Sequence, residues 1–287
     1  MKLQVLHRTH FKYARKVRDS LNEARLLPIN DARQKRHSHK LKVFPSTRIS
    51  HYRDLYNNYV EVFDIIPPHN ELTVISTSVV TTRNEKALAP DARPANIQSF
   101  GSEQEFNRCY DFMQGSSYVD LTPEIWRLAL DITAGETDAW QAARKIMNHI
   151  FKEFTYDGGS TNVHTHTNEV LELHKGVCQD FAHVMIGLCR SLGIPCRYVS
   201  GYLYNGPLDK LLGSQASHAW VEILLPKFGW LGLDPTNNQQ VDGRYIKIGV
   251  GRDYSDVPPI KGSYRGTGKQ KLTVEVAVTL IDEAAVR

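Results

Sequence analysis

The stretch that most constrains this chain is an apolar helix pattern with a cysteine at its start, in residues 176–197, GVCQDFAHVMIGLCRSLGIPCR. Large apolar residues recur there at the three- and four-residue spacing of a buried amphipathic helix. They are Phe181, Met185, Leu188 and Leu192. Gly193 and Pro195 supply a stop signal, because glycine tolerates a left-handed cap and proline cannot continue the helix. The sequence therefore predicts one buried helix that begins at or near Cys178.

A cysteine at a helix N-terminus lies beside unpaired backbone N–H groups and the positive end of the helix dipole. Both favour the thiolate over the thiol, and the same N–H groups could bind an oxyanion. The alternative is an ordinary core cysteine, which describes Cys189 inside the apolar pattern and Cys196 at the start of a strand. Cys178 differs from both because a glycine precedes it closely and the polar Gln179 and Asp180 follow it. We therefore expect a solvent-facing thiol at Cys178.

The composition is that of an ordinary globular protein. Of 287 residues, 41% are hydrophobic and 23% are charged. No apolar run approaches the roughly 18 residues of a membrane-spanning helix. The N-terminal residues mix basic with apolar side chains, unlike a signal peptide, so we expect a cytoplasmic protein. The four cysteines include no CxxC pair, so we expect reduced thiols.

The formal net charge of +4 is mild, and its one dense basic stretch is residues 33–42, RQKRHSHKLK. Nucleic acid could bind such a stretch, but it contains no interleaved aromatic residues on which bases would stack. A solvated loop or strand edge explains it more simply. We therefore expect no nucleic-acid partner and no membrane partner, and the oligomeric state stays open.

The order of patterns along the chain divides it into three parts. Residues 1–118 begin with short β-branched and aromatic runs separated by turn residues, which predict a small antiparallel sandwich or barrel-like domain, and end in a polar connector. Residues 119–250 carry the helix patterns and a second group of strands. Residues 251–287 begin as a Gly/Pro-rich loop and end in one alternating, half-buried strand, which could join the N-terminal sheet.

Within the second part, the sequence predicts two helices before the cysteine and an antiparallel hairpin after it. TPEIWRLALDIT begins with a threonine N-cap and a proline, and TDAWQAARKIMNHIFKEF has one apolar face. The following loop, YDGGSTNVHTHTNEVLELHKG, has no regular period. Residues 218–225 and 229–237 predict two strands joined by a turn. Any reasonable register of this hairpin brings Asp234 within a few residues of His218.

Cys178, His218 and Asp234 together have the chemistry of nucleophilic catalysis. A thiolate needs a base near neutral pH, imidazole suits that role, and a third group must hold the ring in its tautomer. Taken alone, His218 is better explained as a core or surface histidine, and Asp234 as a turn residue before Pro235. Their order and context together favour a nucleophile, a base and an orienting carboxylate.

Three motifs also resemble a known family. GVCQDFAHVMIGLCRSLGIPCRYVSGY, SHAWVEILLPKFGW and LGLDPTN are similar to the transglutaminase-like superfamily of papain-type cysteine enzymes. The strand-rich N-terminus and GRDYSDVPPIKGSY resemble the bacterial branch that carries its own N-terminal domain. The resemblance implies an α+β fold, with a cysteine-protease-like core of helices packed on an antiparallel sheet and an N-terminal β-sandwich-like domain. It also implies catalytic Cys178, His218 and Asp234, and acyl transfer at a carboxamide through a thioester.

In such folds the Cys178 backbone N–H and an upstream side chain stabilise the oxyanion. Tyr156 is the candidate for that second donor, with simple packing as the alternative. Gln179 is a further candidate for oxyanion or substrate contact, and Trp220 is expected to pack over the site and exclude water. The expected substrate is a protein or peptide with a glutamine side chain or amide bond, without a cofactor. The catalytic residues do not decide among transglutamination, proteolysis and deamidation.

Two other classes of function fit parts of the sequence. The same fold could serve as a catalytically idle interaction module, although a retired site has no reason to keep all three catalytic groups. A metal site could instead use His164, His166, His174 and Cys178. A single cysteine and an aperiodic loop make that ligand set weak.

Overall fold

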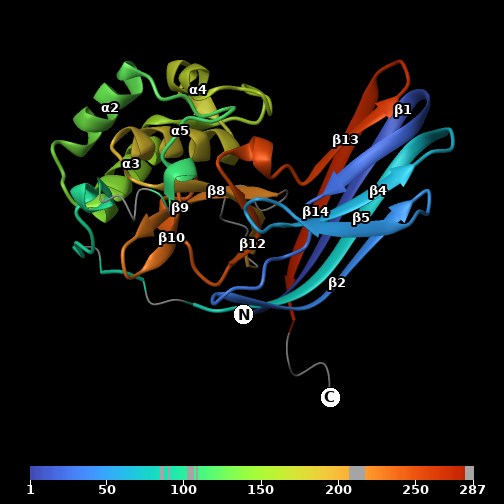
Figure 1. Ribbon diagram of the computed structural model, residues 1–287, viewed down its shortest axis with the longest axis horizontal. Helices are drawn as coiled ribbons and strands as arrows, with labels where there is room; N and C mark the ends of the chain where they lie inside the picture. Colours follow the sequence, from blue (N-terminus) through green and yellow to red (C-terminus); the bar gives the residue numbers. More distant parts are fainter. Residues whose placement is uncertain (85–86, 90, 102–106, 108, 207–216, 282–287) are drawn as a thin grey trace.

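A helix-covered sheet and a curled antiparallel sheet form the two units of the molecule (Figure 1). The computed structural model describes residues 1–84, 87–89, 91–101, 107, 109–206 and 217–281. The α+β class predicted from the sequence is confirmed. Within the described ranges, no helix is both long and apolar enough to cross a membrane.

The N-terminal unit is a seven-stranded antiparallel sheet that folds over on itself. Its strands are β1 (Lys2–Ala24), β2 (Gln34–Phe44), β3 (Ile49–Arg53), β4 (Tyr59–Ile65), β5 (His69–Thr82), β13 (Ile260–Arg265) and β14 (Gln270–Leu280). The long strand β1 belongs to both halves. Its first half pairs with β5 and β14, and its second half pairs with β4 and β13. We call β2–β5–β1–β14 layer A and β3–β4–β1–β13 layer B.

The two layers face each other across an apolar core. Leu72 and Val74 of layer A share one buried cluster with Phe63 and Ile65 of layer B. The predicted sandwich-like arrangement of this unit is therefore confirmed, in the form of one curled sheet. Strand β14, in contrast, is mostly exposed rather than half-buried as predicted.

The second unit is a five-stranded antiparallel sheet in the order β11–β10–β9–β8–β12. Its strands are β8 (Cys196–Leu203), β9 (His218–Leu225), β10 (Gly229–Asp234), β11 (Gln239–Gln240) and β12 (Tyr245–Gly251). The helices are α2 (Pro123–Thr133), α3 (Ala139–Glu153), α4 (Thr167–Leu173) and α5 (Cys178–Ser191). Short elements complete the chain: η1 (Ile97–Gly101), η2 (Tyr110–Phe112), η3 (Tyr254–Asp256), β6 (Thr155–Tyr156) and β7 (Lys175–Gly176).

Helix α5 is the centre of this unit, as the apolar pattern predicts. Every residue from Cys178 to Arg190 is buried, and the helix packs against α2, α3 and α4 and against β8 and β9. Helix α4 lies in the stretch for which the sequence predicts a loop. Its seven residues are too few to show a helical period, and Val170 is its one large buried residue.

The two units are joined by an apolar contact and by hydrogen bonds. Leu3 and Val5 of β1 pack with Tyr202 and Ile246 of the second sheet. The Gln34 side chain donates to the Lys247 carbonyl at 2.7 Å and accepts from the Lys247 N–H at 2.8 Å. The second unit is therefore held against the first half of β1 and the start of β2.

Candidate active site

Cys178 is the first residue of α5, and the turn before it is held by Asp180. The Asp180 carboxylate accepts hydrogen bonds from the Val177 N–H at 2.8 Å and from the Thr161 hydroxyl at 2.6 Å. A side chain at Gly176 would meet the same carboxylate, since a Cβ there would lie 2.7 Å from Asp180 Oδ2. The thiol is therefore placed at the helix start by a glycine and a capping carboxylate.

The expectation of a solvent-facing thiol is wrong, because Cys178 is only 8% exposed. The segment before α4 folds back over the start of α5. Strand β6 pairs with β7 just before the cysteine, and the Gln179 side chain donates to the Val163 carbonyl at 3.2 Å. The cysteine is therefore covered by a segment whose sequence has no regular period.

His218 and Asp234 lie on the neighbouring strands β9 and β10, in the hairpin that the sequence predicts. His218 Nε2 is 2.8 Å from Asp234 Oδ2, and both side chains are completely buried. Burial alone would lower the pKa of His218, but the charge and hydrogen bond of Asp234, together with the nearby Cys178 thiol, raise it to about 10. His218 Nδ1 is buried without a hydrogen-bond partner among the described residues. The imidazole therefore lies between a carboxylate and a thiol.

The Asp234 carboxylate is held by further donors besides His218. It accepts from the Thr236 N–H at 2.9 Å, from Asn237 Nδ2 at 2.8 Å and from the Tyr245 hydroxyl at 2.6 Å. Burial raises the pKa of Asp234, but the charge of His218 and these side-chain hydrogen bonds outweigh burial and leave the pKa below its usual range. Asp234 therefore stays ionised inside the protein.

Sequence reasoning missed Asn237 and Tyr245. Asn237 had a local signal, since it follows Asp234 by three residues in a turn where short polar side chains bond to their neighbours. Tyr245 had no such local signal. It lies on β12, which is separated from β10 by β9 and β8 in the sheet.

Tyr156 lies near the cysteine, as expected for a second oxyanion donor. Burial and the proximity of Cys178 raise the pKa of Tyr156 to about 12, so its hydroxyl keeps its proton at neutral pH. Its ring also packs edge-on against Phe181, at 6.2 Å between ring centroids. Gln179 is buried, and its amide nitrogen is used by the Val163 carbonyl. The Tyr156 hydroxyl and the second N–H of the Gln179 amide both remain candidate donors.

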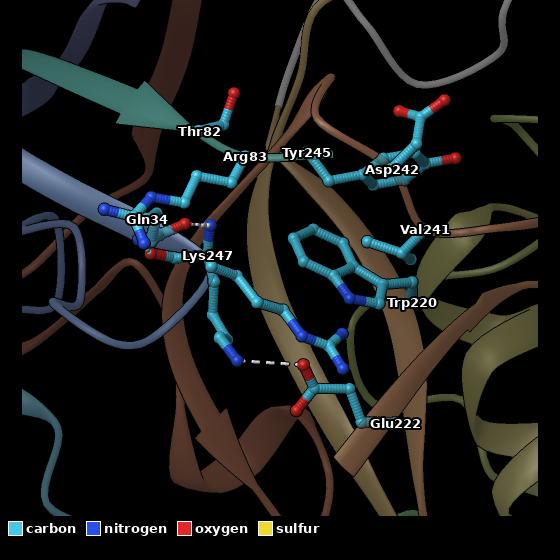
Figure 2. A pocket seen from close by; sticks show the side chains of 10 residues that line it. Gln34, Thr82, Arg83, Trp220, Glu222, Val241, Asp242, Tyr245 and Lys247 are labelled. Atoms are coloured by element: carbon cyan, nitrogen blue, oxygen red, sulfur yellow. Dashed lines mark hydrogen bonds and ion pairs between the residues drawn. The ribbon is translucent and has the colours of Figure 1, made fainter. Parts of the chain in front are cut away.

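Trp220 packs beside His218, with ring centroids 6.2 Å apart, and meets Tyr245 edge-on at 5.2 Å. Figure 2 shows Trp220 on one side of a small polar pocket, with Glu222 and Lys247 joined below it. The pocket measures about 20 Å³, room for about one water molecule, which could serve the buried Trp220 Nε1. Trp220 therefore packs against the His218 ring. The pocket beside it is too small for a substrate.

The residues considered for a metal do not converge. The His164 ring bonds the Tyr118 hydroxyl at 3.0 Å, the His166 ring lies 3.5 Å from Asp120, and His174 packs on a phenylalanine. In the part of the chain that the structure describes, no three His, Cys, Asp or Glu side chains are grouped to hold a metal ion.

Comparisons with protein families match both units. Residues 127–235 match the family model described as transglutaminase-like superfamily, and residues 3–81 match the bacterial transglutaminase-like N-terminal region. An uncharacterized protein of Mycobacterium tuberculosis is 35% identical over 97% of this chain and 92% of its own length. One of Mycobacterium leprae is also 35% identical, over 97% of this chain and 98% of its own length.

A solved structure shows the same fold. A proposed cysteine protease from Cytophaga hutchinsonii superimposes with a TM-score of 0.75 over 98% of this chain and 92% of that one, at 22% sequence identity. A shorter match has a named activity. The protein-glutamine gamma-glutamyltransferase of Pseudomonas aeruginosa is 38% identical over 72 residues, which are 23% of this chain and 11% of that protein.

Proposed function

Because the chain belongs to the transglutaminase-like superfamily, we propose that it is a cysteine enzyme that transfers or hydrolyses the acyl group of a carboxamide in a protein or peptide. The observation that carries the proposal is the buried His218 ring, which is bonded to Asp234 and lies beside the Cys178 thiol. In this proposal Cys178 is the nucleophile, His218 the acid and base, and Asp234 the group that orients the ring.

Acylation starts from a thiolate and an imidazolium. The raised pKa of His218 keeps the ring protonated at neutral pH, so the sulfur can attack as a thiolate. A bond forms between the Cys178 sulfur and the carbonyl carbon, while the carbonyl electrons move to oxygen. The imidazolium then gives its proton to the leaving nitrogen and the carbon–nitrogen bond breaks. A thioester and ammonia, or a free amine, result.

The negative oxygen formed in this step needs hydrogen-bond donors. The first N–H groups of α5 point away from the helix and have no partner inside it. The Tyr156 hydroxyl, protonated at neutral pH, is the second donor. This pair corresponds to the preorganised donors that stabilise a tetrahedral intermediate.

Deacylation runs the proton transfer in reverse. Neutral His218 takes a proton from a water molecule or a primary amine, which attacks the thioester carbon. The carbon–sulfur bond breaks, and the Cys178 sulfur and the His218 ring return to their starting state. Water gives a carboxylic acid, and an amine gives a new amide.

The first experiment is alkylation of the protein by iodoacetamide at pH 5.5, followed by mass spectrometry of each cysteine. Cys178 should react much faster than Cys109, Cys189 and Cys196, because it lies beside the His218 ring and is 8% exposed, whereas the other three are 0% exposed. His218→Ala should remove that selectivity. Equal rates for all four cysteines in the wild-type protein would contradict the proposal and favour a catalytically idle module.

A second experiment identifies the acceptor. Incorporation of a labelled primary amine, release of ammonia and cleavage of peptides should be measured side by side on broad substrate panels, with Cys178→Ala as the control. We expect at least one of the three activities in the wild-type protein and none in the variant. Absence of all three in the wild-type protein would count against an enzyme.

A further inference from the structure

The sandwich of the N-terminal unit is open on the side where β14 lies. Leu72, Phe11 and Leu272 are neighbours across layer A, on β5, β1 and β14. Leu72 is fully buried, Phe11 is half-buried, and Leu272 is 52% exposed, although all three belong to the same face of the sheet. In the next row, Val74 is buried and Val274 is 39% exposed. The inner face of layer A is therefore uncovered at β14.

Layer B leaves a gap opposite this face at Gly262, which lies between the larger Ile260 and Tyr264 of β13. Phe63, Asn22 and Gly262 are neighbours across β4, β1 and β13. A Cβ at Gly262 would collide with the Asn22 side chain, so the row ends in glycine. The result is a slot between the layers, with Phe11, Leu272 and Val274 on one wall and Asn22, Gly262 and Tyr264 on the other.

The slot continues into the second unit. Figure 1 shows β13 and β14 along the side of the sandwich that faces the helix-covered unit. The cleft that contains the slot has a volume of about 570 Å³ and is also lined by Tyr118, Val163 and Ser217. Ser217 directly precedes His218, and the Val163 carbonyl accepts the hydrogen bond of Gln179, the residue after Cys178. The cleft therefore extends from the sandwich to residues that adjoin His218 and Gln179, although Cys178 itself does not line it.

The chemistry of the lining selects an uncharged occupant. Among the described residues that line the cleft there is no carboxylate, and Lys261 is the one lysine or arginine. Aromatic and aliphatic side chains dominate, and a charged group placed between them would lose its hydration without a partner. Asn22 is 7% exposed, and its Nδ2 has no hydrogen-bond partner among the described residues, so a backbone carbonyl of an occupant would satisfy it.

We propose that the slot binds aromatic or aliphatic residues of the acyl-donor peptide, a few positions from the amide that Cys178 attacks. The volume suits several peptide residues, since ligand sites of about 300–1,000 Å³ are typical. The position of Val163 and Ser217 in the lining, beside Gln179 and His218, favours the substrate over a second copy of this chain. The inference rests on the proposed function for the identity of the peptide as a donor, but its binding can be measured without catalysis.

The experiment uses the full chain with Cys178→Ala, and fluorescence anisotropy of fluorescein-labelled hexapeptide amides. Two probes carry Phe-Leu before or after a central glutamine, and two matched probes carry Lys-Glu instead. The apolar probes should bind more tightly. Leu272→Glu should weaken their binding by about tenfold or more, because the new carboxylate meets an apolar side chain.

The matched control is Thr273→Glu, on the same strand but on the opposite face. Thr273 is exposed and does not line the cleft, so this variant should bind within about twofold of the parent protein. Both variants should melt at the parent temperature. Equal losses in the two variants, or equal affinity for apolar and charged probes, would overturn the inference.

Two further measurements separate the possible failures. Iodoacetamide rates, taken on Leu272→Glu with Cys178 intact, should match the wild type. If Cys178 reacts selectively but apolar peptides are not preferred, the proposed peptide binding in the slot is refuted and the proposed function is not. If apolar peptides bind but Cys178 does not react selectively, the proposed function is refuted and the binding role of the slot is supported. A dimer in sedimentation that Leu272→Glu dissociates would identify a second copy as the occupant and overturn the inference.

Discussion

The surroundings of two buried histidines, His218 and His183, leave one ring positively charged and the other neutral at pH 7. Both are almost completely inaccessible, at 1% and 0% exposure. His218 contacts the Asp234 carboxylate, and its pKa is raised. His183, on α5, accepts a hydrogen bond from the Tyr254 N–H at 3.1 Å through Nε2. Burial lowers its pKa to about 4, although the charge of Asp253 acts in the opposite direction.

The comparison shows that burial does not decide the charge of an imidazole at neutral pH. At His218 a carboxylate at hydrogen-bond distance reverses the effect of burial, whereas at His183 burial outweighs the charge of Asp253 and leaves the ring neutral. One ring is therefore suited to exchange protons with a sulfur, and the other is suited to fill the core. Four predictions test this difference, from the largest effect to the smallest.

Removal of the His218 ring should have the largest effect on kcat, and removal of the His183 ring should mainly affect stability. His218→Ala should reduce kcat by about 10⁴-fold, because the acid and base are both lost. His183→Gln should keep kcat within about tenfold and lower the free energy of unfolding by about 1–3 kcal/mol, because a buried hydrogen bond is disturbed. Steady-state kinetics on the best amide substrate and chemical denaturation measure the two effects. Similar losses of kcat in both variants would contradict the assignment of a catalytic role to His218 and a structural role to His183.

Replacement of the carboxylate should have a smaller effect than loss of the ring. Asp234→Asn keeps the shape of the site but cannot stabilise an imidazolium, so kcat should fall by about 10³-fold. The pKa of His218 should fall as well, so alkylation of Cys178 should require higher pH than in the wild type. The pH profile of the iodoacetamide rate measures this shift. An unchanged profile would mean that Asp234 does not set the charge of His218.

Removal of the proposed oxyanion donor should have a weaker effect. Tyr156→Phe keeps the ring that packs on Phe181 and removes only the hydroxyl, so kcat should fall by about 10²-fold while KM changes little. The control is the iodoacetamide rate, which needs no oxyanion and should be unchanged. A wild-type kcat in Tyr156→Phe would mean that Tyr156 only packs against its neighbours.

The smallest effect is the pH dependence of stability. The pKa of His183 is about 4 in the folded protein, below its unfolded value near 6.5, so the unfolded chain binds more protons in between. Its contribution is present above pH 6.5 and is lost as the pH falls towards 4. The stability advantage of the wild type over His183→Gln should therefore shrink by about 2 kcal/mol between pH 7 and pH 5. Denaturation at both pH values measures it, and a constant or growing advantage would contradict the assignment.

The parts of the site that sequence could predict have local signals. The start of α5 is marked by apolar spacing and a preceding glycine, and the β9–β10 hairpin by alternation around a short turn. These two signals bring His218 and Asp234 together and place Cys178 at a helix start. They could not give the register of the hairpin, which depends on packing across the whole sheet.

The rest of the site depends on contacts between distant segments. Tyr245 reaches Asp234 from another strand, and the burial of Cys178 comes from a segment with no periodic pattern. The two histidines have similar sequence surroundings, since each has apolar neighbours. Both are also buried in the structure. Only the neighbours in space separate a ring beside a carboxylate from one beside a backbone N–H.

The pairing of β1 with β14 has a consequence for how the polypeptide assembles. Leu3 lies opposite Leu280, so β1 cannot complete its pairing until β14, far along the chain, has been synthesised. Such distant partners close slowly, because almost the whole chain must be brought into one loop. The helical unit is therefore synthesised entirely before the N-terminal sheet can be completed. Until β14 pairs, the edge of β1 that it will cover stays open to wrong partners.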